Sequence, residues 1–103
     1  MSRVTVQIPP PLQQFAEGAA ELAVEADTVG EALQRIGEQR AALLARVLTP
    51  EGALRPYVNV FVGERNARRL DGLQTRLSDG DVVAIIPAVA GGARRAPWGR
   101  FTG

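Results

Sequence analysis

One long segment of the sequence has the spacing of an amphipathic helix, and strand patterns lie on both sides of it. Thr28 precedes Glu31 by three residues, the capping-box spacing that satisfies free backbone N–H groups at a helix start. Gly37 disfavours a helix, but an apolar face resumes after it. We therefore expect a helix from about Val29 to about Leu48 that is interrupted or bent near Gly37. The apolar residues at helical spacing in its first half are Val29, Ala32, Leu33 and Ile36.

Two strands are expected before this helix. Residues 3–8 and 20–25 alternate between apolar and polar side chains, which is the period of a half-buried strand. Pro9 follows the first strand, and residues 12–19 are expected to turn around Gly18. A connection this short favours a hairpin.

The remaining strands are expected after the helix. Residues 57–62 place Val58, Val60 and Val62 on one face, and residues 82–86 form a short β-branched run. Between them we expect a turn at residues 63–66, a short strand near residues 68–70, and one helical turn spanning Leu73 and Leu77.

This order of elements predicts an α+β domain in which a mixed sheet of four or five strands covers one main helix. In such an arrangement the first and last strands can lie side by side and parallel at the centre of the sheet. That is the β-grasp topology of ubiquitin-like proteins.

Composition limits the possible functions. The chain has 103 residues, 46% hydrophobic and 22% charged, with no histidine and no cysteine. These absences remove thiol nucleophiles, the usual zinc ligands and the residue most often used as a general base. We therefore expect neither an enzyme nor a metal site. No secretory leader is apparent and no apolar run approaches the roughly 18 residues of a membrane span, so the expected location is cytoplasmic, without a membrane partner.

All 12 basic residues are arginine. GC-biased coding is the favoured explanation. The alternative is that a protein with a reactive C-terminal carbonyl avoids internal amines that would capture it.

The last strand is framed by two kinds of turn residue. Asp79-Gly80-Asp81 precedes it, and Pro87, which cannot donate to a β-ladder, ends it. The chain then runs through Ala88, Val89 and Ala90 to Gly91-Gly92. Asp79 and Asp81 could be a functional carboxylate pair, but turn formation explains them better.

These residues resemble the MoaD/ThiS family of ubiquitin-like sulfur carriers. The likeness covers roughly residues 3–92 and is most specific where Asp79-Gly80-Asp81 leads through Pro87-Ala88-Val89-Ala90 to Gly91-Gly92. The resemblance implies a carrier whose Gly92 carboxylate is adenylated with ATP by an enzyme of the ubiquitin-activating type. The resulting thiocarboxylate would supply sulfur to a downstream biosynthetic enzyme, while residues 87–92 enter the partner cleft. No cofactor would be bound by the carrier itself.

The chain departs from the family pattern because residues 93–103 follow Gly92. We expect a β-grasp domain over residues 1–92 and a basic tail over residues 93–103, which a peptidase removes by cleaving between Gly92 and Ala93. An arginine-aromatic tail that binds single-stranded nucleic acid is the weaker reading, because only three charges contribute. Those tail residues are Arg94, Arg95, Trp98, Arg100 and Phe101.

Phe61 and Ile86 fall on strand positions opposite to the inward-facing valines and isoleucine. Isolated exposed apolar residues need no explanation, but two on adjacent strands would form a patch that marks a partner site. The resemblance agrees, because these carriers dock on activating enzymes through an exposed sheet face beside the tail.

Two other functions remain open at this point. A ubiquitin-like modifier would join Gly92 to lysines of other proteins, and the sequence does not separate this outcome from sulfur transfer. The third possibility is a β-grasp interaction module that is never activated and whose tail binds a partner.

Overall fold

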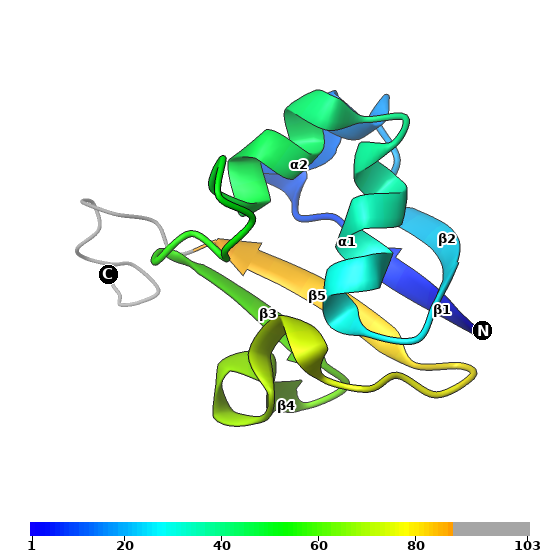
Figure 1. Ribbon diagram of the computed structural model, residues 1–103. Helices are drawn as coiled ribbons and strands as arrows, with labels where there is room; N and C mark the ends of the chain where they lie inside the picture. Colours follow the sequence, from blue (N-terminus) through cyan, green and yellow to red (C-terminus); the bar gives the residue numbers. More distant parts are fainter. Residues whose placement is uncertain (88–103) are drawn as a thin grey trace, which may run out of the picture.

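The computed structural model describes residues 1–87, and residues 88–103 lie outside the described part of the chain. Five strands, two α-helices and three short 3-10 helices follow one another as shown in Figure 1. The strands are β1 (Ser2–Gln7), β2 (Glu21–Ala26), β3 (Val58–Val62), β4 (Arg65–Asn66) and β5 (Val82–Pro87). The helices are η1 (Pro10–Ala16), α1 (Val29–Gly37), α2 (Ala41–Val47), η2 (Ala67–Arg69) and η3 (Gly72–Gln74).

The strands form one mixed sheet in the order β2-β1-β5-β3-β4. β1 and β2 are an antiparallel hairpin, with Val4 opposite Val24. β5 pairs parallel with β1 and antiparallel with β3, so the last strand occupies the centre of the sheet. This is the expected β-grasp arrangement, with the first and last strands side by side.

Both helices cover the same face of the sheet (Figure 1). Alternation along the strands turns every second side chain toward them, and those of Val6, Val60 and Val83 are completely buried. From α1 and α2 the core receives Val29, Ala32, Leu33, Ile36, Leu43 and Val47. The opposite, outer face of the sheet carries no helix within residues 1–87.

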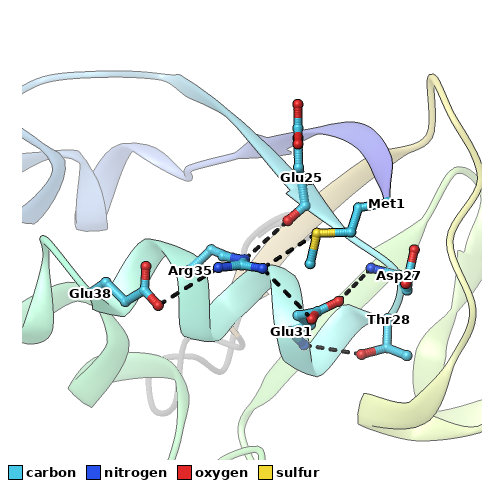
Figure 2. A network of polar contacts seen from close by, with 7 residues as sticks. All are labelled: Met1, Glu25, Asp27, Thr28, Glu31, Arg35 and Glu38. Carbon is cyan, nitrogen blue, oxygen red and sulfur yellow. Dashed lines mark hydrogen bonds and ion pairs between the residues drawn. The ribbon is translucent and has the colours of Figure 1, made fainter.

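Thr28 caps the start of α1 as the sequence predicts, but the Glu31 carboxylate accepts from Asp27, the residue before the cap, and not from Thr28 itself (Figure 2). The backbone N–H of Glu31 donates to Thr28 Oγ1 at 3.1 Å, and the backbone N–H of Asp27 donates to Glu31 Oε1 at 2.7 Å. One turn later, Arg35 donates to the carbonyl of Glu25 at 3.2 Å. These bonds tie α1 to the end of β2.

The helical segment breaks after Gly37, as the sequence predicts, and α2 starts at Ala41. The glycine is needed because Leu44 of α2 packs against it. A Cβ at position 37 would collide with Leu44 Cδ2 and lie 3.1 Å from both Leu44 Cβ and Cγ. The close approach of the two helices thus explains a residue that helix propensity alone disfavours.

Four local expectations were wrong. Residues 10–16, partly expected as turn, form η1, in which the Gln13 amide donates to the carbonyl of Ile8 at 3.0 Å. Residues 63–66 are only partly a turn, because Arg65 and Asn66 form β4. Only Leu73 lies in the helical turn η3, whereas Leu77 is buried in an extended segment.

The expected strand at residues 68–70 is also absent, because Arg68 belongs to η2. Its backbone N–H donates to Asn66 Oδ1 at 2.9 Å, which caps the 3-10 helix. Its guanidinium donates to the carbonyls of Arg55 at 2.6 Å and Val58 at 2.8 Å. These contacts hold the segment against the start of β3 in a turn rather than extending it.

Gly37→Ala should destabilise the protein by about 1–3 kcal/mol, because overpacking against Leu44 exceeds the gain in helix propensity of roughly 1 kcal/mol. Urea denaturation measures the change. The matched control is the double variant with Leu44→Ala, in which the added methyl group has room and the extra cost of Gly37→Ala should vanish. Equal effects of Gly37→Ala in the two backgrounds would contradict this packing explanation.

Candidate functional site

The candidate site begins where β5 ends. β5 is hydrogen-bonded on both sides, and its Val83 and Ile85 side chains are buried against the helices. Its last residue, Pro87, is opposite Val58, the first residue of β3. The chain therefore leaves the domain from the centre of the sheet.

The Asp79-Gly80-Asp81 segment fixes the start of β5, as its turn chemistry predicts. Asp79 Oδ1 accepts the backbone N–H of Arg3 at 2.7 Å, and Asp81 Oδ2 accepts that of Ser78 at 2.8 Å. Gly80 has φ +89°, a backbone conformation that favours glycine. Both carboxylates thus serve the turn and its attachment to β1.

Phe61 and Ile86 lie on the outer face of the sheet. Phe61 is opposite Ala84 and Ile86 is opposite Asn59, so the two apolar side chains are diagonal neighbours on adjacent strands. Ile86 is 47% exposed, whereas Phe61 is half-buried. Their positions are compatible with a shared partner surface beside the end of β5.

Tyr57 is a further candidate for the partner surface, and it was not predicted from the sequence. It is 47% exposed and directly precedes Val58, so it stands next to the point where β5 ends. The sequence contains a signal for its position on the outer face, because Tyr57 continues the alternation of Asn59 and Phe61 and is the only tyrosine in the chain.

The remaining expected site residues lie outside the described part of the chain. They are Ala88, Val89, Ala90, Gly91, Gly92 and Ala93, together with the tail through residue 103. Within residues 1–87, no group of three or more histidine, cysteine, aspartate or glutamate side chains is placed to hold a metal ion. None of the helices in this part is long and apolar enough to cross a membrane.

Known proteins resemble this chain over most of its length. The model of the ThiS family matches residues 6–92. The sulfur carrier protein CysO of Mycobacterium tuberculosis is 35% identical over 91 residues, which cover 86% of this chain and 98% of the relative.

Two solved structures share the fold with similar coverage. One is that of the Amycolatopsis orientalis BexX/CysO complex, with a TM-score of 0.79, 33% identity, and coverage of 84% of this chain and 97% of the other. The other is the solution structure of small archaeal modifier protein 1 from Methanosarcina acetivorans, with a TM-score of 0.77, 28% identity, and coverage of 87% and 96%.

The family match extends through the strand, the turn and the glycine pair that suggested a sulfur carrier. The CysO of M. tuberculosis is named a sulfur carrier protein. This chain accordingly belongs to the ThiS family of ubiquitin-like sulfur carrier proteins.

Proposed function

We propose that this protein carries sulfur as a thiocarboxylate on Gly92, after a peptidase has removed residues 93–103. The observation that carries the proposal is the position of β5. It ends at the centre of the sheet with the exposed side chain of Ile86 near its last residue, and the chain continues through residues 88–90 to the glycine pair within the family match.

The proposed chemistry has two steps. A Gly92 carboxylate oxygen attacks the α-phosphorus of ATP, and pyrophosphate leaves, so the product is an acyl-adenylate. A donor at the oxidation level of sulfide, HS−, then attacks the carbonyl carbon, AMP leaves with the electrons of the C–O bond, and loss of the S–H proton leaves the thiocarboxylate. Both steps take place in the cleft of an adenylating partner, because the carrier's composition offers neither cysteine nor histidine.

The residue types at Gly91 and Gly92 suit this chemistry. A carboxylate that enters a narrow cleft needs an approach without side-chain bulk, and two successive glycines provide it. Phe61 and Ile86 would form the apolar contact with the adenylating partner, and Tyr57 lies close enough to the end of β5 to extend it.

Trimming is required because Gly92 has no free carboxylate in the full chain. In the proposed order, the peptidase acts first, adenylation and sulfur transfer follow, and a separate biosynthetic enzyme takes up the sulfur. The crystal structure of the A. orientalis BexX/CysO complex supports sulfur uptake by a separate protein, because there a related carrier is bound to another protein.

A second function is supported by the similarity to small archaeal modifier protein 1. In that case the activated Gly92 carbonyl would be attacked by a lysine Nζ of another protein, AMP would leave, and an isopeptide bond would form. Since the chain has no lysine, Gly92 of one copy could not be joined to a lysine of a second copy.

The intact mass of the protein purified from its native cells should correspond to residues 1–92 with one oxygen replaced by sulfur. Activation needs the free Gly92 carboxylate, so trimming and sulfur addition should appear together. A full-length, unmodified mass during active sulfur assimilation would contradict the proposal, as would adenylation at Gly103 of the untrimmed chain.

The matched control is a Gly92→Val variant of a gene that ends at codon 92. It has a free C-terminal carboxylate but a branched side chain at the reacting residue, so its mass should lack the added sulfur. Tryptic peptides in which residues 77–92 are linked to a lysine of another protein would establish the modifier function instead.

Phe61→Asp should leave the melting temperature within a few degrees of the wild type but weaken binding to the adenylating partner. Loss of one well-packed interface aromatic costs about 2 kcal/mol, or roughly 30-fold in affinity. The readout is the fraction of residues 1–92 recovered as thiocarboxylate.

Two substitutions serve as controls for Phe61→Asp. Ala23→Asp places the same charge on β2, at the edge of the sheet away from β3, and should leave the thiocarboxylate fraction unchanged. Val60→Asp places it at a fully buried position and should unfold the domain. If Phe61→Asp unfolds the domain as Val60→Asp does, Phe61 belongs to the core and not to a partner surface.

A further inference from the structure

A hollow of about 290 Å³ opens between α2 and the loop that joins α2 to β3. Ala41 and Ala45 are four residues apart on α2, so their small side chains leave room on the same helical face. Leu44 and Leu48 contribute apolar surface beside them, and Arg55 closes the hollow from the loop.

Hydrogen bonds fix the shape of this hollow. Arg55 Nε donates to the carbonyl of Ala45 at 2.9 Å, and the backbone N–H of Arg55 donates to the carbonyl of Val47 at 3.0 Å. Within the loop, the backbone N–H of Ala53 donates to Thr49 Oγ1 at 3.1 Å. The loop is therefore bound to α2, and the Arg55 guanidinium is held at the rim.

The hollow belongs to the end of the sheet at which β5 stops. The backbone N–H of Val58 donates to the carbonyl of Arg55 at 3.0 Å, and Val58 is paired with Pro87. In Figure 1, the loop after α2 descends to the start of β3 beside the tip of β5. A segment that follows Pro87 thus starts close to the hollow.

The C-terminal extension has the length and the residue to fill it. Trp98 comes eleven residues after Pro87, and a chain of that length can span up to roughly 36 Å. An indole ring combines a large apolar body with one N–H group, and an arginine at the rim can lie over its face. Because the segment is covalently attached, it meets the hollow at an effective concentration on the order of millimolar, so even a weak site would be substantially occupied.

We propose that Trp98 docks in the hollow between α2 and the following loop, with its indole ring against Ala45 and Leu44 and beside the Arg55 guanidinium. The occupant is this chain's own C-terminal extension. The sheet face that carries Phe61 and Ile86 remains uncovered in this arrangement.

Docking would hold the chain at two points, Pro87 in the sheet and Trp98 in the hollow. The bond between Gly92 and Ala93 lies between them and would be presented to a peptidase away from the body of the domain. This consequence rests on the proposed trimming, whereas the docking itself does not.

Fluorescence tests the docking directly, because Trp98 is the only tryptophan in the chain. In full-length protein, its emission should lie at shorter wavelength than in a synthetic peptide of residues 93–103, and acrylamide quenching should be several-fold weaker. Ala45→Glu should return both quantities to the values of the peptide, because a carboxylate then occupies the hollow.

Ala42→Glu is the matched control. Ala42 is an exposed residue of the same helix that does not line the hollow, so this variant should keep the wild-type emission and quenching. Circular dichroism should show that both glutamate variants fold, because each replaces an exposed alanine with another good helix former.

Three results would overturn the proposal. The first is wild-type emission and quenching equal to those of the peptide. The second is a shift that survives Ala45→Glu, which would place Trp98 elsewhere, for example on the sheet face. The third is a shift that disappears on dilution, which would mean docking on a second copy. None of these bears on Gly92, whose conversion to a thiocarboxylate is decided separately by mass.

Discussion

The ladder that β5 forms with β1 and β3 is the interaction on which the rest of the structure depends. It pairs the first strand of the domain with the last and unites the strands in one sheet, whose buried residues pack beneath the helices. The hydrogen bond from the backbone N–H of Arg3 to Asp79 fixes where this ladder begins. Because the ladder joins distant parts of the sequence, its formation requires most of the chain to be in place.

Periodicity and capping chemistry predicted the main elements well. The alternation in β1, β2, β3 and β5 indicates burial on one face, and Thr28 as the N-cap marks the start of α1 correctly. The segment between β3 and β5 was harder to predict. There the chain path depends on the guanidinium of Arg68 and its acceptors at Arg55 and Val58, and a contact between residues this far apart leaves no periodic signal.

The candidate site was only partly accessible from the sequence. Alternation was sufficient to place Phe61 and Ile86 on the same face, but the register that makes them diagonal neighbours needed the paired strands. Tyr57 shows the same limit, because its nearness to the end of β5 follows from the pairing of Val58 with Pro87. The role proposed for Gly92 rests on family resemblance, since a glycine pair alone specifies no chemistry.

The central position of β5 also has a mechanical consequence. Any partner that draws the chain end into a cleft pulls β5 along its own axis, while the bonds to β3 run across that axis. The hydrogen bonds of the ladders on both sides then carry the load together. When an edge strand is peeled off a sheet, by contrast, the load falls on one hydrogen-bonded pair after another. The domain can therefore resist a pull on its C-terminal end while keeping its fold.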